Sequence, residues 1–203
     1  MSNKQGEQKI KGEKLVLVGE TTTGKTCIIM KAIRDYFQEG EMTTYVASNY
    51  LYETVLESGK KINLDIWDTA GQERFRNVNK IFYKEAKAVL LVYDITKKVT
   101  FDEIKNYWAA EAKERACKNA VLGIIGNKSD LFEDEEVKEE EAKAFAESIG
   151  AFFMLTSAKL GTGIHEALKE AAEKIDERGL SQISTGMQLG VSVKPQKKKC
   201  CEK

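Results

Sequence analysis

The hydrophobic positions of this chain fall into short apolar runs that are separated by segments of helical periodicity. Four runs are almost continuously apolar, as is typical of strands buried on both faces of a parallel sheet: residues 14–18, 88–93, 120–125 and 151–155. Residues 50–57 and 61–67 alternate instead around Glu57-Ser58-Gly59-Lys60, and this pattern predicts a β-hairpin. The sequence therefore predicts an α/β domain with a mostly parallel sheet, one antiparallel edge strand and helices on both faces.

The helices between these strands are marked at their ends. Thr100-Phe101-Asp102-Glu103 has the spacing of a capping box and predicts that a helix begins there. Residues 137–149 and 162–178 each carry an apolar stripe. Because Gly150 and Gly179 follow these two segments directly, both helices are expected to end at those points.

The composition is that of a globular protein with one domain. The 203 residues are 32 % charged and 42 % hydrophobic, and 32 basic residues balance 32 acidic ones, so no overall field draws the chain to nucleic acid. Neither a signal peptide nor a long apolar run is present, and the four cysteines fit a reduced, cytosolic setting. We expect a disordered N-terminus over 1–12, a monomeric domain over 13–178 and a flexible tail over 179–203.

The run Gly19-Glu20-Thr21-Thr22-Thr23-Gly24-Lys25-Thr26 matches G-x-x-x-x-G-K-[ST], the loop that wraps the phosphates of a nucleotide. It stands between an expected strand and an expected helix, whose first N–H groups point toward bound phosphate. Lys25 is expected to reach the terminal phosphates, and the Thr26 hydroxyl to coordinate Mg²⁺. The alternative is a flexible Gly/Thr loop, which would not require a strand and a helix on its two sides.

A second motif, after the apolar run 120–125, indicates which base the nucleotide carries. It reads Asn127-Lys128-Ser129-Asp130. A carboxylate at Asp130 accepts hydrogen bonds from the N1–H and 2-amino groups of guanine, which adenine cannot offer, so discrimination should be strong. We expect Asn127 to tie this loop to the phosphate loop and the Lys128 stem to pack on the base. Thr156-Ser157-Ala158-Lys159, after the last strand, is expected to supply a backbone N–H for the guanine 6-oxo group. Either motif alone also fits an ordinary polar loop.

Trp67-Asp68-Thr69-Ala70-Gly71-Gln72-Glu73 lies at the end of the third expected strand. Asp68 is placed to hold Mg²⁺ through water, and the Gly71 N–H to contact a γ-phosphate. Gln72 is the candidate catalytic residue, because a glutamine orients the attacking water in Ras and Gα proteins. The alternative for Gln72 is an ordinary glutamine in a solvent-exposed loop.

With these motifs, residues 10–178 resemble a small GTPase of the Ras superfamily, in its Rab branch. The most branch-specific segments are residues 65–76, DIWDTAGQERFR, and 91–96, LVYDIT. The resemblance implies a Ras-like P-loop NTPase fold with a six-stranded sheet, GTP or GDP with Mg²⁺ as ligands, and a guanine stacked on Phe37, which is otherwise a core aromatic. The implied nucleotide contacts are Thr21, Thr22, Thr23, Gly24, Lys25, Thr26, Cys27, Phe37, Thr44, Gly71, Asn127, Lys128, Asp130, Ser157, Ala158 and Lys159.

The segment that corresponds to the first switch departs from the family, which usually has Thr-Ile-Gly followed by Phe two residues later. Residues 43–50 read TTYVASNY here. Counting from the phosphate loop places Thr44 at the metal-binding threonine, whereas counting back from Gln72 places Tyr45 there. We choose Thr44, because only a hydroxyl on a short side chain reaches Mg²⁺ comfortably, so the expected metal site is Thr26, Thr44 and Asp68. The missing glycine argues against typical effector recognition.

Two further features bear on activity and location. Thr21 occupies a phosphate-loop position that is often Gly or Ser in the family, and its branched side chain is predicted to crowd Gln72 and the attacking water. The chain ends in Lys197-Lys198-Lys199-Cys200-Cys201-Glu202-Lys203, a poor four-residue prenylation box but a good Rab-like tail. The resemblance implies geranylgeranyl groups on Cys200 and Cys201, with the lysines attracted to anionic lipid. The alternative is a charged tail with unmodified thiols.

The sequence thus predicts a switch that hydrolyses GTP slowly and regulates vesicle traffic, in the cytosol and on the cytoplasmic face of an intracellular membrane. Because no arginine of this chain is an obvious internal catalytic finger, we expect an activating protein, together with an exchange protein, effectors and a lipid-shielding carrier. One alternative is a binding module that holds GTP or GDP but hardly hydrolyses it. The other, an ATP-binding enzyme, is opposed by Asp130.

Overall fold

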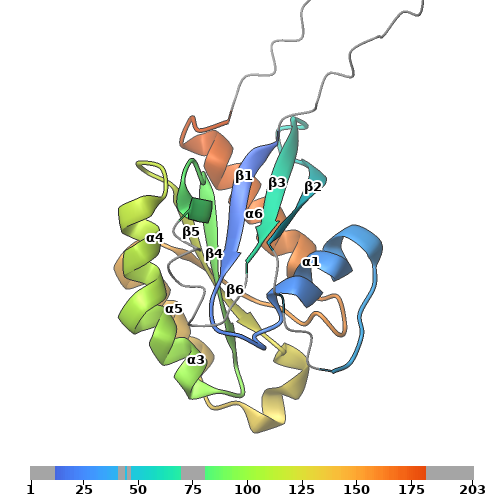
Figure 1. Ribbon diagram of the computed structural model, residues 1–203, viewed down its shortest axis with the longest axis vertical. Helices are drawn as coiled ribbons and strands as arrows, with labels where there is room; N and C mark the ends of the chain where they lie inside the picture. The colour runs from blue at the N-terminus through green and yellow to red at the C-terminus, as the bar shows by residue number, and fades with distance from the viewer. Residues whose placement is uncertain (1–11, 41–43, 45–46, 70–80, 182–203) are drawn as a thin grey trace, which may run out of the picture.

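The computed structural model describes residues 12–40, 44, 47–69 and 81–181, and a six-stranded sheet of order β2-β3-β1-β4-β5-β6 runs through its centre (Figure 1). The strands are β1 (Glu13–Val18), β2 (Ser48–Val55), β3 (Lys61–Asp68), β4 (Ala88–Asp94), β5 (Val121–Asn127) and β6 (Phe152–Leu155). Only β2, at one edge, pairs in the antiparallel sense. The predicted sheet is confirmed.

The predicted hairpin joins β2 to β3. Its turn is closed by the Leu56 N–H, which donates to the Lys60 carbonyl at 2.9 Å, and by the Gly59 N–H, which donates to the Leu56 carbonyl at 2.9 Å. Gly59 has φ 82°, a left-handed conformation that glycine adopts without strain. The hairpin places the N-terminal end of β2 beside the C-terminal end of β3, where Ser48 is paired with Asp68.

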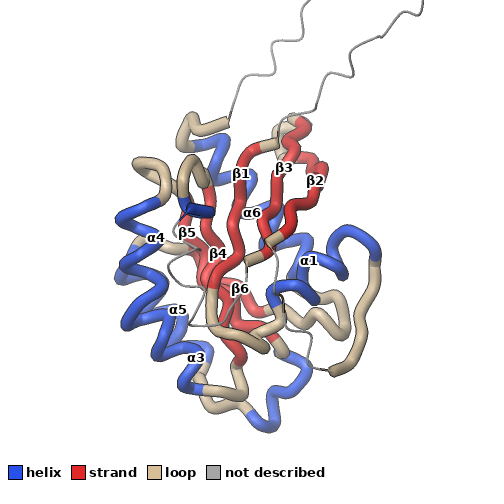
Figure 2. Tube along the Cα trace, in the orientation of Figure 1, coloured by secondary structure: helices blue, strands red, loops and turns tan. Residues whose placement is uncertain are grey.

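Helices cover both faces of the sheet (Figure 2). One face packs against α1 (Lys25–Arg34) and α6 (Ile164–Glu177). The other packs against α5 (Glu139–Ile149) and against a continuous helical segment of α3 (Lys98–Glu103), the π-helix η2 (Ile104–Trp108) and α4 (Ala109–Arg115). A 3₁₀-helix, η3 (Ser129–Asp134), follows β5. No helix in the described part of the chain combines the length and the apolar content that a membrane span requires.

The two helical layers produce two apolar cores, one on each side of the sheet. In β1 the side chains alternate between them: Leu15 and Leu17 face α1 and α6, while Val16 and Val18 face the other layer, and all four are fully buried. This is the two-residue period of a strand covered on both faces. The continuous apolar runs of the sequence have this physical origin.

The predicted N-cap of the helix after β4 is wrong. α3 begins at Lys98, with Lys97 as its N-cap in an extended conformation, so Thr100 lies within the first turn rather than at the cap. The Thr100 hydroxyl accepts a hydrogen bond from the Asp94 N–H at 3.0 Å and donates one to the Lys97 carbonyl at 2.7 Å. Thr100 therefore ties the start of α3 to the end of β4. The predicted ends at Gly150 and Gly179 are confirmed, with φ of 71° and 64°.

Candidate functional site

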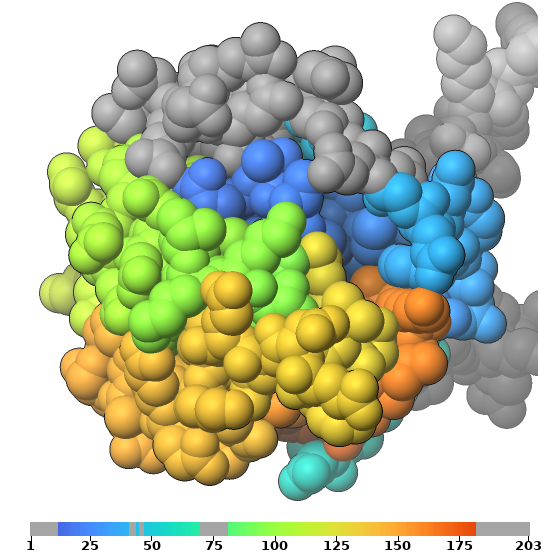
Figure 3. Space-filling view, turned by 90° about the horizontal axis from the view of Figure 1, so that it is seen from below, coloured from blue at the N-terminus to red at the C-terminus, as the bar shows by residue number. Residues whose placement is uncertain are grey.

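A cavity of about 350 Å³ opens at the carboxyl edge of the parallel strands, where ligands bind in open α/β sheets. Figure 3 views this edge, where the phosphate loop (blue), the start of α3 (green) and the residues after β5 (yellow) meet. Most of the predicted nucleotide contacts line the cavity: Thr21, Thr22, Gly24, Lys25, Thr26, Cys27, Phe37, Thr44, Asn127, Lys128, Asp130, Ala158 and Lys159. Gly71, Gln72, Cys200 and Cys201 lie outside the described residues.

The phosphate loop depends on glycine at two positions. Gly19 and Gly24 have φ of 138° and 91°, and a Cβ at Gly19 would come within 2.1 Å of the Val92 carbonyl oxygen. A Cβ at Gly24 would come within 2.3 Å of Asn127 Nδ2. Thr22 has φ 61°, a left-handed conformation that is rare for a β-branched residue and costs about 1–2 kcal/mol. The conformation of this loop therefore requires glycine at positions 19 and 24 and holds Thr22 in a strained backbone conformation.

Lys25 stands at the centre of the phosphate loop. Its buried Nζ donates to the carbonyl oxygens of Gly19, at 2.8 Å, and Glu20, at 2.7 Å. Burial lowers the pKa of Lys25 to about 8, while the charges of Asp68 and Glu20 act in the opposite direction. A buried cation that is held by carbonyl dipoles is suited to a polyanionic ligand such as a nucleotide phosphate chain.

The three predicted metal residues lie together. The side-chain oxygens of Thr26 and Thr44 are 2.5 Å apart, and Thr26 Oγ1 donates to Asp68 Oδ2 at 2.8 Å. Burial raises the pKa of Asp68, and its second oxygen, Oδ1, is buried without a hydrogen-bond partner among the described residues. Two hydroxyls and a carboxylate with an open acceptor are the hard oxygen ligands that Mg²⁺ prefers, so these residues fit the ion.

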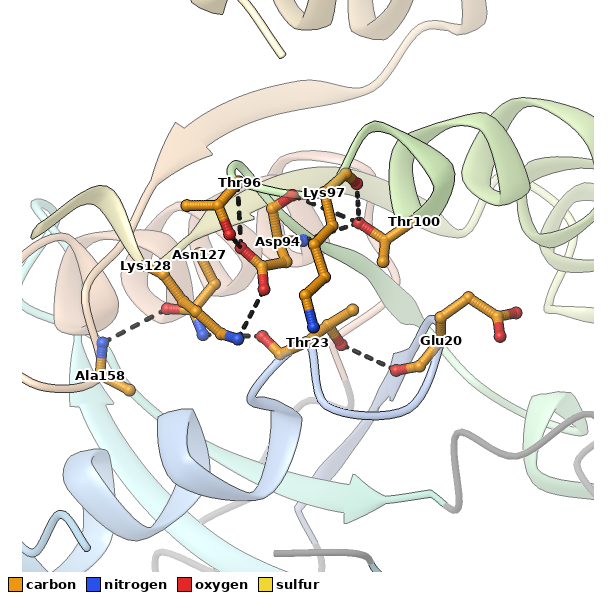
Figure 4. A network of polar contacts seen from close by, with 9 residues as sticks. All are labelled: Glu20, Thr23, Asp94, Thr96, Lys97, Thr100, Asn127, Lys128 and Ala158. Atoms are coloured by element: carbon orange, nitrogen blue, oxygen red, sulfur yellow. Dashed lines mark hydrogen bonds and ion pairs between the residues drawn. The ribbon is translucent and has the colours of Figure 1, made fainter. Parts of the chain in front are cut away.

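Asn127 joins three loops of the site, as Figure 4 shows in part. Its Nδ2 donates to the Thr23 carbonyl at 2.8 Å, which is the predicted tie to the phosphate loop. Its Oδ1 accepts from Thr156 Oγ1 at 3.1 Å and from the Ala158 N–H at 3.3 Å. Ala158 N–H, the predicted partner of the guanine 6-oxo group, is thus held in place by Asn127. Thr23 itself, another predicted nucleotide contact, is fully buried within the loop, and its side chain does not line the cavity.

The predicted base-reading carboxylate is fixed by a neighbour. Ser157 Oγ donates to Asp130 Oδ1 at 2.6 Å and accepts from the Leu160 N–H at 3.0 Å. Ser157 is fully buried and does not line the cavity, so its hydroxyl orients the Asp130 carboxylate from the side away from the cavity. A carboxylate whose orientation is set in this way can accept two parallel hydrogen bonds from one edge of a base.

Lys128 has an unusual backbone conformation, and its side chain is fixed by an ion pair. Its backbone has φ 67°, and its Nζ lies 2.5 Å from Asp94 Oδ2 (Figure 4). Asp94, only 1 % exposed in its side chain, also accepts hydrogen bonds at Oδ1 from the Thr96 N–H and hydroxyl, at 3.0 and 2.8 Å. Because its ammonium is fixed at Asp94, the aliphatic stem of Lys128 lines the cavity wall.

Several cavity residues were not predicted: Gln38, Glu39, Gly40, Thr69, Lys97 and Leu131. Lys97 is the most informative of them, because Lys128 is paired with Asp94 and Lys159 with Glu39, at 2.8 Å, whereas Lys97 has no ion pair within the described residues. Figure 4 shows its side chain extending toward Thr23. One signal was present in the sequence: Lys97 and Asp94 follow an apolar strand at the same sheet edge as the two predicted motifs.

The sequence of this chain matches the model of the Ras family over residues 14–177. It is 40 % identical over 169 residues to the Ras-related protein RABD2a of Arabidopsis thaliana, an alignment that covers 83 % of this chain and 82 % of that protein. The GTP-binding protein YPTM2 of Zea mays is 36 % identical over 194 residues, with 93 % and 95 % covered. The Ras-related protein Rab-1A of Dictyostelium discoideum is 38 % identical over 165 residues, with 81 % of each chain covered.

Proposed function

This chain belongs to the Ras family, and we propose that it is a Rab-like GTPase that binds GTP or GDP with Mg²⁺ and regulates vesicle traffic. One observation carries the choice of nucleotide: Asp130, oriented by Ser157, faces the same cavity as the phosphate loop. The cavity therefore combines a carboxylate suited to guanine with a cationic loop suited to phosphates. Adenine offers Asp130 no matching pair of donors.

The reaction is the in-line attack of water on the γ-phosphate of GTP, which yields GDP and phosphate. Lys25 and the loop N–H groups would stabilise the charge that develops on the phosphate oxygens. Thr26, Thr44 and Asp68 would hold Mg²⁺, which would supply positive charge that offsets the negative charge of the phosphates. Gln72 would orient the attacking water. We expect unaided turnover on the order of 10⁻⁴ s⁻¹, raised as much as about 10⁵-fold by an arginine from an activating protein.

The rest of the proposal concerns location and partners. Geranylgeranyl groups on Cys200 and Cys201, with Lys197, Lys198 and Lys199 before them, would anchor the protein to the cytoplasmic face of an intracellular membrane. A carrier that covers these lipids, an exchange protein and effectors would complete the cycle. Mass spectrometry of the protein from its own cells tests the anchor, since unmodified thiols at both cysteines would exclude it.

No feature of the described residues favours the alternative function, a scaffold that binds the nucleotide without hydrolysing it.

The choice of nucleotide is tested by competition. We expect unlabelled GDP and GTP to displace a fluorescent GDP from the protein and ATP and ADP to fail at the same concentrations. In the matched variant Asp130→Ala, the preference for guanine over adenine should largely disappear, because the base loses its charged acceptor. Equal displacement by ATP and GTP from the unaltered protein would refute the guanine assignment.

A further inference from the structure

The helix that follows β4 contains a π-helix, a rare conformation in α-helical segments. Within η2 the chain makes a wider turn, so the Ala109 N–H bonds to the carbonyl of Ile104, five residues earlier. Such a turn holds one residue more than an α-helical turn and is frequently found at functional sites. It rotates the residues that follow it by about 100° relative to an uninterrupted helix.

The rotation decides which side chain points to the phosphate loop. Trp108, the last residue of η2, is fully buried, and its indole Nε1 donates to Glu20 Oε1 at 3.1 Å. Without the extra residue, Tyr107 would take the direction that Trp108 has. A buried indole N–H requires an acceptor. Here that acceptor is a carboxylate on the second residue of the phosphate loop rather than a carbonyl of a neighbouring helix.

Glu20 connects this contact to the lysine of the site. Its backbone carbonyl accepts a hydrogen bond from Lys25 Nζ at 2.7 Å and another from Thr23 Oγ1 at 2.9 Å. Its side chain accepts from Trp108, which lies 88 residues further along the chain. A shift of Glu20 therefore moves the carbonyl that fixes the Lys25 ammonium.

We infer that Trp108 and Glu20 are positioning residues for nucleotide binding: the indole N–H, placed by the π-helix, holds Glu20, and Glu20 in turn holds Lys25 at the phosphates. The inference rests on the proposed function, because the phosphates belong to the guanine nucleotide. Breaking the contact lets the loop relax and speeds nucleotide release.

The test is the release rate of a fluorescent GDP from the full-length protein after addition of excess unlabelled GDP. Trp108→Phe removes the N–H and keeps an aromatic ring, and Glu20→Met removes the acceptor at similar length. We expect each to speed release about tenfold, because the lost bond is to a charged group. Glu20→Gln keeps an acceptor oxygen and should remain close to the unaltered protein. The matched control is Trp67→Phe, whose indole bonds to Asp65 on β3 at 2.9 Å, away from the loop; its release rate should not change.

A double variant separates positioning from mere packing. If one contact carries both effects, Trp108→Phe combined with Glu20→Met releases GDP no faster than the faster single variant. Two results would overturn the inference. One is a double variant whose acceleration of GDP release is the product of the two single accelerations, and the other is a folded Trp108→Phe protein that releases GDP at the unaltered rate. Should Trp108→Phe not fold, Glu20→Met with Glu20→Gln as its pair decides the question. An unaltered protein that retains no guanine nucleotide would instead refute the proposed function.

Discussion

The side-chain oxygens of Thr26 and Thr44 lie 2.5 Å apart, although 18 positions separate the two residues. Thr26 belongs to the start of α1, and Thr44 to the connection between α1 and β2. In the sequence alone, Thr44 and Tyr45 are competing candidates for the metal ligand. This contact favours Thr44, because it places a second small hydroxyl beside Thr26 and Asp68.

The metal site predicts that Thr44→Ala weakens Mg²⁺ binding to the nucleotide-bound protein by about ten- to a hundredfold, the loss expected when a charge-assisted ligand disappears. Thr44→Ser keeps the hydroxyl and should stay near the unaltered protein. The measurement is the nucleotide release rate as a function of Mg²⁺ concentration. Tyr45→Phe is the control, and a loss in that variant with none in Thr44→Ala would assign the ligand to Tyr45.

Ser157→Ala should lower the affinity for GDP about tenfold, because Asp130 loses the hydroxyl that orients it. Inosine diphosphate lacks the 2-amino group of guanine, so it can donate only one hydrogen bond to the Asp130 carboxylate instead of two. We therefore expect the substitution to narrow the preference for GDP over inosine diphosphate, as measured by competition. An unchanged preference together with a weaker affinity for both would mean that Ser157 supports the loop rather than the carboxylate.

Lys97→Ala should weaken GDP binding about threefold at low salt and less at high salt, as for an exposed charge near an anionic ligand. Lys98→Ala is the matched control, because Lys98 Nζ already bonds to both carboxylate oxygens of Glu141 at 2.7 Å. Titration calorimetry at two ionic strengths measures the effect. Equal losses in the two variants would show that any lysine at the start of α3 acts alike.

Thr22→Gly should raise the free energy of unfolding of the nucleotide-free protein by about 0.5–1 kcal/mol, since glycine accepts φ 61° without strain but loses more chain entropy. Thr23→Gly should have the opposite effect, because the fully buried Thr23 donates to the Glu20 carbonyl at 2.9 Å. Chemical denaturation of both variants gives the comparison. A destabilised Thr22→Gly protein would mean that the Thr22 side chain makes contacts that outweigh its strain.

Much of the fold follows from local pattern. β1 and β4 are recognisable because both their faces are covered, and α5 and α6 because glycines follow their apolar stripes. The phosphate loop and the loop of Asp130 are recognisable because their spacing matches what phosphate and guanine require. Thr100 is not the N-cap that its spacing suggests, because its hydroxyl bonds to the end of β4, a tertiary contact that the spacing of a capping box does not reveal.

Other features depend on contacts between distant segments. The π-helix that points Trp108 at Glu20 adds a single residue to a turn, and an apolar stripe does not show where such a residue is placed. The hydroxyl of Ser157 bonds to Asp130, a contact between two loops that the sequence of neither loop reveals. Lys97 joins the cavity only because α3 begins beside the phosphate loop.

The most direct test of the account is single-turnover hydrolysis of preloaded GTP with excess Mg²⁺, in the unaltered protein and in Gln72→Leu. We expect slow conversion to GDP on the order of 10⁻⁴ s⁻¹ that the substitution suppresses, because leucine cannot orient the attacking water. Conversion at the same rate in both proteins would contradict the role of Gln72. Bound GTP that stays intact in both would contradict the central claim, that this chain is a working GTPase.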